Sequence, residues 1–157
     1  MFLYGEDRDI CWRTWLYGYK VVVEKDAFFY HDSFCITQDI KDYRTTVQKR
    51  YLGEFNALRA ILKNYSFGYL VWILPPFLLI NLAEILLFTV LLRLDIVNAY
   101  LESYKDNLAH LTDLMVLRKK VQGERKIIDR ELIRQMYFIS AKSLLLLKWG
   151  VPKFKEI

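Results

Sequence analysis

The sequence has only two cysteines, Cys11 and Cys35, which is too few for a disulfide framework. Both stand among apolar or aromatic residues, which fits a reducing compartment. We expect no secretory signal peptide, because charged residues begin at Glu6. The sequence also shows no internal repeat and no low-complexity tract. What remains is a chain of 157 residues, long enough for one ordinary domain and short for two.

Neither positive nor negative charge dominates the sequence. The sequence is 54% hydrophobic and 26% charged, so it is not disordered by composition. The net charge is +5, and most of the basic excess follows a long apolar run. A basic excess beside an apolar segment is more typical of contact with an anionic membrane surface than with nucleic acid, although a solvated face of mixed charge gives the same pattern. We therefore expect membrane lipid, and no nucleic acid, among the partners.

The apolar run, FGYLVWILPPFLLINLAEILLFTVLL at residues 67–92, contains one charged residue, Glu84, and no basic residue. A helix across a bilayer core needs roughly 20 apolar residues, so the length suffices. A buried soluble helix is the alternative, but so small a chain has little core to hide it. Pro75 and Pro76 allow either one kinked helix or a short apolar piece before a helix from about Phe77 to Arg93. Both flanks are basic, which gives no orientation and also fits a re-entrant hairpin or an in-plane anchor.

Periodicity and turn residues divide the chain before this run into short elements. The expected elements are a helix at 6–17, strands at 19–23 and 27–30, a loop at 32–42 and a helix at 43–64. Gly18 stands where a helix commonly has its C-terminal glycine. His31 ends the second expected strand.

The residues after position 94 are expected to form amphipathic, basic helices at the membrane surface. Apolar residues at helical spacing form one stripe: Leu101, Leu108, Leu111, Leu114, Met115 and Leu117. The basic run RKKVQGERK follows at 118–126, and a further helix is expected from Asp129. Residues 144–149 form an aromatic and basic edge that is typical of a membrane interface.

The opening stretch carries the residues best suited to chemistry. Carboxylates at the start of a helix are stabilised by its dipole and its free N–H groups, so Asp7 and Asp9 can simply be caps. Their order with later residues is more specific. The succession E-D-x-D-I-C-W-R, G-Y-K-V and A-F-F-Y-H resembles the end of the catalytic domain in family 2 glycosyltransferases, which are inverting enzymes with the GT-A fold. The resemblance is close over residues 4–31, looser further on, and nearest to the membrane-associated, rhamnosyltransferase-like kind.

This resemblance implies roles for particular residues. An inverting transfer needs a base for the proton of the acceptor hydroxyl, and a carboxylate within hydrogen-bond reach can act as one. By position Asp7 would be that base, and Glu6 would orient the acceptor or the loop. A divalent cation, Mg²⁺ or Mn²⁺, would stabilise the leaving nucleotide diphosphate, with most of its ligands expected from an N-terminal half. His31 would bind this metal or the diphosphate, unless it is only a polar residue at a strand end.

The candidates for substrate binding are Trp12, Arg13 and Asp9. The ring of Trp12 can stack on a pyranose, or it can pack in the core. Arg13 can bind a phosphate, or it can pair with an acidic neighbour. The run Asp7-Arg8-Asp9 also matches the D-x-D metal motif of GT-A enzymes, but in the family that motif lies well upstream, so we do not assign it here.

The expected fold class is an α+β fragment dominated by helices, with a C-terminal stub of a GT-A (Rossmann-like) α/β domain followed by a membrane-associated helical region. Its expected parts are the end of the catalytic domain at 1–42, a connecting amphipathic helix at 43–66, an apolar membrane segment at 67–93 broken at Pro75–Pro76, and basic amphipathic helices at 94–157. No β-α-β unit for a nucleotide is visible. We therefore expect the chain to begin within a domain, as a fragment or one piece of a split enzyme, and to be inactive alone.

The resemblance implies an enzyme that transfers a sugar from a nucleotide-sugar donor to a lipid-linked or polysaccharide acceptor. Because such donors are cytosolic, its catalytic side would face the cytoplasm at the cell membrane. Two other interpretations stay open. The chain can be a non-catalytic, membrane-associated remnant or scaffold, or a small membrane protein whose opening resembles the family by chance.

Overall fold

The structure, a computed structural model, describes residues 4–28, 44–136 and 140–154. Helices dominate these residues, as the sequence predicts. The helices are α1 (Glu6–Leu16), α2 (Val47–Asn64), α3 (Phe67–Val90), α4 (Leu94–Ala109), α5 (Leu111–Gly123), α6 (Asp129–Ile133) and α7 (Ala141–Trp149). Two short strands, β1 (Arg44–Thr45) and β2 (Lys153–Phe154), pair in parallel, with Arg44 opposite Lys153.

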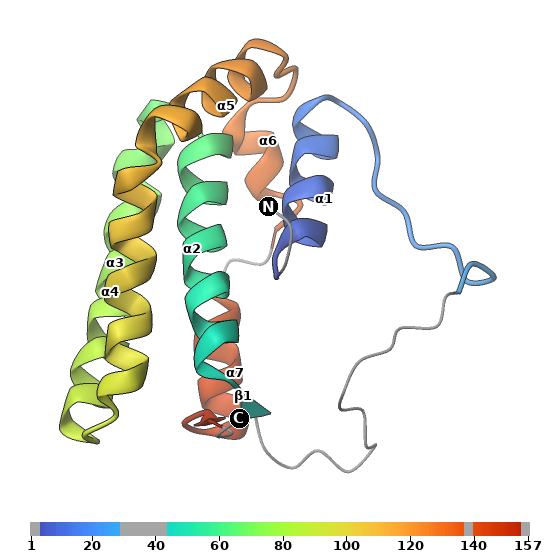
Figure 1. Cartoon of the computed structure of the whole chain (residues 1–157). Helices are drawn as coiled ribbons and strands as arrows, with labels where there is room; N and C mark the ends of the chain where they lie inside the picture. Colours follow the sequence, from blue (N-terminus) through green and yellow to red (C-terminus); the bar gives the residue numbers. More distant parts are fainter. Residues whose placement is uncertain (1–3, 29–43, 137–139, 155–157) are drawn as a thin grey trace.

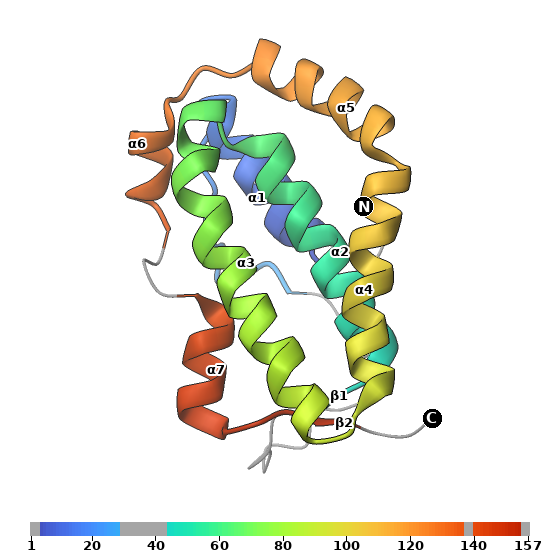
Figure 2. The ribbon, with the colours of Figure 1, turned by 90° about the vertical axis from the view of Figure 1, so that its left-hand side faces the viewer.

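The long helices are arranged in layers around α2. Helices α3 and α4 lie side by side, and α2 packs against both of them (Figures 1 and 2). Helix α1 lies on the other side of α2, and α5 crosses the end of the bundle where α2 finishes. Helix α7 lies beside the opposite end of α3 (Figure 2). The molecule therefore has one face built from α3 and α4 and an opposite side that carries α1.

Helix α1 ends as the sequence predicts. Gly18 has a φ of 82°, a left-handed conformation that costs other residues free energy. The N–H of Gly18 donates to the carbonyl of Trp15, and the N–H of Tyr19 donates to the carbonyl of Thr14. This pair of bonds is a Schellman motif, which satisfies carbonyls that the helix end would leave free.

The strand predicted at 19–23 is wrong. These residues are irregular and exposed, and Val23 keeps 94% of its accessible surface. β-Branched residues favour a strand only where another strand can pair with it and cover one face, and no described segment lies beside 19–23 in that way. The second predicted strand, at 27–30, lies partly outside the described residues. The sheet that the described residues do form, β1–β2, lies outside both predicted strands.

Helix α2 begins and ends with side-chain caps. The hydroxyl of Thr46 accepts a hydrogen bond from the N–H of Lys49 at 3.1 Å, which satisfies a free donor of the first turn. At the other end, α5 supplies the caps. Arg118 donates to the carbonyls of Leu62 and Tyr65, and Gln122 donates to those of Lys63 and Asn64. The basic run at 118–126 therefore has a structural role at the end of α2.

Helix α3 is continuous through Pro75 and Pro76, so the break predicted at this pair is absent. It is the one helix in the described ranges that is long and apolar enough to cross a membrane, with a mean hydropathy of 2.1 over its best 18 residues. Only 11% of that window is buried inside the molecule. The exposed apolar residues of α3 lie away from α2 and include Val71, Trp72, Leu78, Leu79, Leu82 and Leu86.

Helix α4 buries a different face from the one that its leucines suggest. Its buried residues are Ile96, Ala99, Tyr100, Ser103 and Asn107. Of the six residues in the predicted stripe, Leu114 is fully buried and the other five are exposed. Leu94, Leu101 and Leu108 are seven residues apart, so they share one exposed side of α4. The side of the molecule made by α3 and α4 thus exposes many apolar side chains, although α4 also exposes Glu102 and Lys105, and soluble proteins seldom expose large apolar patches.

Candidate functional site

The predicted base, Asp7, is exposed in the first turn of α1 and lines a cavity of about 390 Å³, here called the polar cavity. The other walls come from the residues before α1, from β1, from the first half of α2 and from the start of α7. The lining includes Tyr4, Gly5, Arg8, Lys49, Arg50, Gly53, Glu54 and Lys142. Within the described part of the chain, Asp7 has no hydrogen-bond or ion-pair partner. Its carboxylate is therefore free to meet a ligand in this cavity.

Neither Asp7 nor Asp9 is the cap of α1. The residue at the N-cap is Gly5, which has a φ of 109° and makes no side-chain cap bond. Glu6 lies in the same first turn as Asp7 and is half-buried, and its Oε2 has no hydrogen-bond partner among the described residues. The two acidic residues predicted for catalysis are therefore adjacent at the start of α1, but only Asp7 lines the polar cavity.

Asp9 joins α1 to α2. Its carboxylate is 3% exposed, lies 2.7 Å from the Lys63 ammonium and 3.0 Å from the Arg13 guanidinium, and accepts a 3.1 Å hydrogen bond from Asn64. Burial raises the pKa of Asp9, but the hydrogen bonds from Lys63 and Asn64 and the nearby positive charges outweigh it and hold the pKa below its ordinary value. Asp9 thus forms one ion pair with Lys63 between α1 and α2 and another with Arg13 within α1, and the predicted contact of Asp9 and Arg13 with substrate stays a prediction.

Trp12 packs in the core. Its side chain is 6% exposed and meets the ring of Tyr65 edge to face, with 4.8 Å between ring centroids. It belongs to a buried cluster that also contains Leu16, Leu70 and Leu132. Of the two interpretations of this tryptophan, the structure gives it the packing position. Its buried N–H has no partner in the described ranges.

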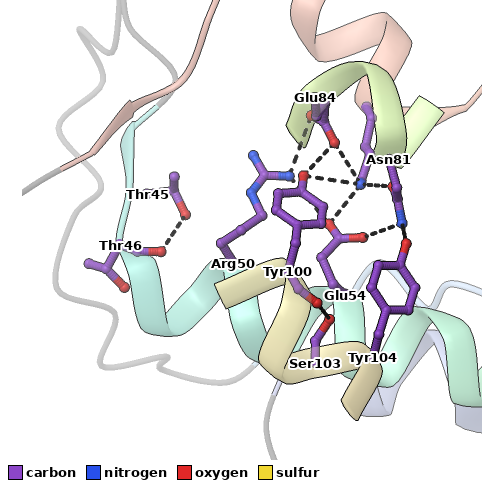
Figure 3. A network of polar contacts seen from close by, with 10 residues as sticks. Thr45, Thr46, Arg50, Glu54, Asn81, Glu84, Tyr100, Ser103 and Tyr104 are labelled. Carbon is purple, nitrogen blue, oxygen red and sulfur yellow. Dashed lines mark hydrogen bonds and ion pairs between the residues drawn. The ribbon is translucent and has the colours of Figure 1, made fainter. Parts of the chain in front are cut away.

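A network of charged side chains lies at one edge of the polar cavity (Figure 3). It joins four helices, because Arg50 and Glu54 belong to α2, Glu84 to α3, Tyr100 to α4 and Lys142 to α7. The Lys142 ammonium lies 2.7 Å from Glu54 and 2.8 Å from Glu84. Arg50 lies 3.4 Å from Glu54 and 3.6 Å from Glu84. The two positive and two negative charges cancel, which reduces the cost of burying them.

Uncharged groups complete this network. Asn81 of α3 donates to Glu54 at 3.1 Å and to the Tyr104 hydroxyl at 2.7 Å, and its carbonyl oxygen accepts from Lys142 (Figure 3). The Tyr100 hydroxyl donates to Glu84 at 2.5 Å. Burial, followed by the charge of Glu54, raises the pKa of Tyr100, so its hydroxyl keeps the proton that it donates. Glu84, the single charge of the apolar run, therefore has its charged partners inside the molecule.

A second cavity, of about 550 Å³, adjoins the polar cavity and is here called the apolar cavity. The two share Arg8, Ala57 and Lys142. Its walls come from α1, α2, α3 and the segment around α6 and α7. They are mostly apolar and aromatic, and include Trp15, Ile61, Tyr65, Ile73, Phe77, Ile80 and Met136. A volume of this size lies within the usual range for small-molecule pockets, about 300–1,000 Å³.

The predicted metal ligand, His31, lies outside the described residues. Residues 4–28, 44–136 and 140–154 contain no group of three or more His, Cys, Asp or Glu side chains placed to hold a metal ion. These residues alone therefore do not form a site for the predicted Mg²⁺ or Mn²⁺, and we assign no step to a metal.

Comparisons with protein-family models, with curated proteins and with solved structures found no match.

The cations beside Asp7 are absent from the list of candidate residues drawn from the sequence. Arg8 is exposed and has no hydrogen-bond or ion-pair partner in the described part, and Lys49 lies 5.5 Å from the centroid of the Tyr4 ring. In the sequence, Arg8 could have been recognised as a candidate by its position between Asp7 and Asp9. Lys49 reaches the cavity only through the packing of α1 on α2, which no local pattern reveals.

Proposed function

We propose that this chain is part of an inverting glycosyltransferase in which Asp7 is the general base. The observation that supports this most directly is the position of Asp7 in the polar cavity, beside Arg8 and Lys49 and without a partner in the described residues. A base must reach the proton that it removes, and an exposed carboxylate on a cavity wall meets that condition. The GT-A stub and the rhamnosyltransferase-like kind belong to this proposal too.

The chemistry assigned to these residues is a single displacement. The acceptor hydroxyl oxygen attacks the anomeric carbon of the donor sugar, and its proton passes to the Asp7 carboxylate. The bond between the anomeric carbon and the diphosphate oxygen breaks, and both its electrons leave with the nucleotide diphosphate. Arg8 and Lys49 stabilise anionic oxygens in the cavity. Glu6 orients the acceptor, and the donor-binding residues come from another part of the complete enzyme.

The test compares two matched aspartate variants in the complete enzyme. Asp7→Asn removes the base and keeps the size of the side chain, so sugar transfer should fall by about 10²–10⁴-fold with the thermal midpoint unchanged. Asp113→Asn is the control, because Asp113 is exposed on α5, away from both cavities. Its transfer rate should equal that of the wild type. Full transfer by the Asp7 variant would overturn the proposal and favour a membrane-bound scaffold, the second candidate function.

The apolar outer face of α3 supports the scaffold as well as the enzyme, because both require membrane attachment. For that attachment we propose that α3 lies in the plane of the membrane and does not cross it. At 1.5 Å per residue its 24 residues measure about 36 Å, which is enough to span. However, α4 lies along it and exposes the Glu102–Lys105 ion pair, and α2 exposes Lys49. Each charge placed near the bilayer centre costs about 2.5–3.5 kcal/mol, which disfavours a spanning bundle.

The two arrangements differ in where the ends of α3 emerge. A single cysteine is placed at Gly68, where no other atom lies within 4 Å of the added side chain, or at exposed Leu91, with Cys11 and Cys35 replaced by serine. A membrane-impermeant maleimide is then added to sealed vesicles. If α3 lies in the plane, Gly68→Cys and Leu91→Cys react from the same side. Labelling from opposite sides would show that α3 spans.

A further inference from the structure

The apolar cavity adjoins the polar cavity, so together they suit a ligand with one apolar end and one polar end. Ala57, Arg8 and Lys142 line both cavities and mark the place where they join. On the apolar side the walls are the aromatic and aliphatic side chains of α1, α2 and α3. On the polar side they carry charged groups.

The charges that are left over in the polar cavity are mainly positive. Arg50 and Lys142 are compensated by Glu54 and Glu84 at 2.7–3.6 Å. Arg8 and Lys49 have no carboxylate within ion-pair distance in the described part of the chain. Asp7 is the one uncompensated carboxylate of the described lining, so the surplus is one positive charge. An anionic group is the ligand that this surplus favours.

Helix α3 gives the apolar cavity a boundary with the membrane. Ile73, Phe77 and Ile80 line the cavity, and the side of α3 turned away from α2 exposes Leu79 and Leu82. If that side contacts lipid, only the thickness of one helix separates the cavity from the bilayer, about 10–12 Å. The cavity would therefore lie close to the hydrocarbon layer that holds such a chain.

We propose that the apolar cavity binds the hydrocarbon chain of an anionic amphiphile, a long-chain phosphate ester, whose phosphate lies in the polar cavity beside Arg8 and Lys49. The binding site does not depend on sugar transfer, but its role as the site of the acceptor rests on the proposed function. In that role the phosphate lies beside the two cations, and a hydroxyl of the group that the phosphate carries lies next to Asp7 as the acceptor. Burial of the chain supplies most of the binding free energy, and the two cations select the phosphate.

Tryptophans that line the cavity make binding directly measurable. The chain has four, of which Trp12 and Trp15 line the apolar cavity, whereas Trp72 is 76% and Trp149 is 37% exposed elsewhere. Replacing Trp72 and Trp149 with phenylalanine leaves only the two cavity tryptophans as reporters. The full 157-residue chain is placed in zwitterionic phosphatidylcholine nanodiscs and titrated with an alkyl phosphate that carries two bromines on its chain, which quench nearby tryptophan.

The expected result is saturable quenching by the brominated alkyl phosphate that exceeds quenching by the matched brominated alkanol and by brominated phosphatidylcholine. Unbrominated alkyl phosphate should reverse it, and inorganic phosphate at the same concentration should not. Equal quenching by all three brominated lipids, or equal reversal by inorganic phosphate, would overturn the proposal. The first result would show only general insertion, and the second only a phosphate site.

Variants separate the two halves of the site. Arg8→Glu should weaken binding by about tenfold or more, whereas Lys119→Glu, at an exposed position on α5, should not change it. Ile73→Phe fills the apolar cavity and should reduce binding, with Leu79→Phe on the exposed side of α3 as its control. Unchanged binding in both Arg8→Glu and Ile73→Phe would contradict the proposal. The two variants are measured separately, so a folding defect in one of them leaves the other as a test.

This test is independent of the transferase proposal. Binding that persists while Asp7→Asn transfers sugar normally would keep the amphiphile site and reject the enzyme. Absent binding together with loss of transfer in Asp7→Asn would keep the enzyme and reject the site.

Discussion

Two of the buried polar clusters in the described part of this molecule, one around Asp9 and one around Glu84, differ in how their charges are balanced. Both hold helices onto α2 with charged side chains. Around Asp9, two cations face one carboxylate, and Arg13 remains partly exposed to water. Around Glu84, two cations face two carboxylates, and every charge has at least two partners. The neutral cluster around Glu84 stands beside the apolar helix α3 and the charged one around Asp9 beside α1. Glu84 and Lys142 are nevertheless more exposed than Asp9 and Lys63, so burial alone does not set how completely charge is balanced.

Removing one member of the neutral cluster should have the largest effect. Glu84→Leu leaves Arg50 and Lys142 with a surplus positive charge, so we expect a loss of about 3–5 kcal/mol in the free energy of unfolding. The double variant Glu84→Leu, Lys142→Leu keeps one cation and one carboxylate and should regain most of that loss. Chemical denaturation in lipid nanodiscs, followed by circular dichroism, measures both.

The control for this prediction is Glu102→Gln. Glu102 pairs with Lys105 on the surface of α4 at 3.4 Å, and exposed pairs contribute about 0–1 kcal/mol. If Glu84→Leu costs no more than this control, the neutral cluster does not stabilise the fold, and the contrast between the two clusters fails.

The cluster around Asp9 should have a smaller effect that depends on pH. Asp9→Asn should reduce the free energy of unfolding by about 2 kcal/mol at neutral pH, because Lys63 loses its charged partner. The folded-state pKa of Asp9 lies below its ordinary value of 3.8, so its stabilising effect is fully present above that pH and is lost as pH falls through the folded pKa. The difference between wild type and variant should therefore be constant from about pH 7 to pH 5 and shrink below about pH 4.

Denaturation at several pH values measures this difference, with Asp113→Asn as the exposed control. A difference that grows as pH falls would mean that the pKa of Asp9 is raised in the folded state, and would contradict the ion pair with Lys63.

The smallest effects should come from two glycines, one near each cluster. Gly18→Ala forces an alanine into the left-handed region at the end of α1 and should destabilise by about 1 kcal/mol. Gly53→Ala, in the interior of α2 with no other atom within 4 Å of the added methyl, should stabilise by about 0.5–1 kcal/mol. Thermal unfolding distinguishes the two by sign, and equal signs would contradict the helix boundaries.

Local signals in the sequence predicted some elements well. Gly18 marked the end of α1, and the spacing of apolar residues marked most of α2. The apolar run predicted α3 but not its continuity through Pro75 and Pro76. The helix-breaking tendency of proline describes a helix without packing partners. The structure holds the same helix against α2 and α4 through Asn81 and Glu84 on its inner side. The prediction of a strand at 19–23 was wrong because tertiary context again outweighed local preference. A valine-rich segment forms a strand only beside another strand, and no described segment pairs with this one.

The candidate site was only partly accessible from the sequence. Asp7 could be singled out by its position in the succession of residues that carries the resemblance. Asp9 looked equivalent in the sequence, but in the structure it forms an ion pair with Lys63, 54 positions later. The two cavities arise where four helices converge, and no single segment contains their lining. Lys142 illustrates this, because it reaches Glu54 and Glu84 from a helix that starts only at Ala141.

The caps that α5 places on the end of α2 have a consequence for the order of folding. The carbonyls of Leu62 to Tyr65 belong to the first half of the chain, but Arg118 and Gln122, which satisfy them, are synthesised more than fifty residues later. During synthesis, when a chain lengthens by about 5–20 residues per second, the last turn of α2 must wait several seconds for its partners. Until then those carbonyls lack these partners, so this end of the bundle cannot be completed before α5 has been synthesised.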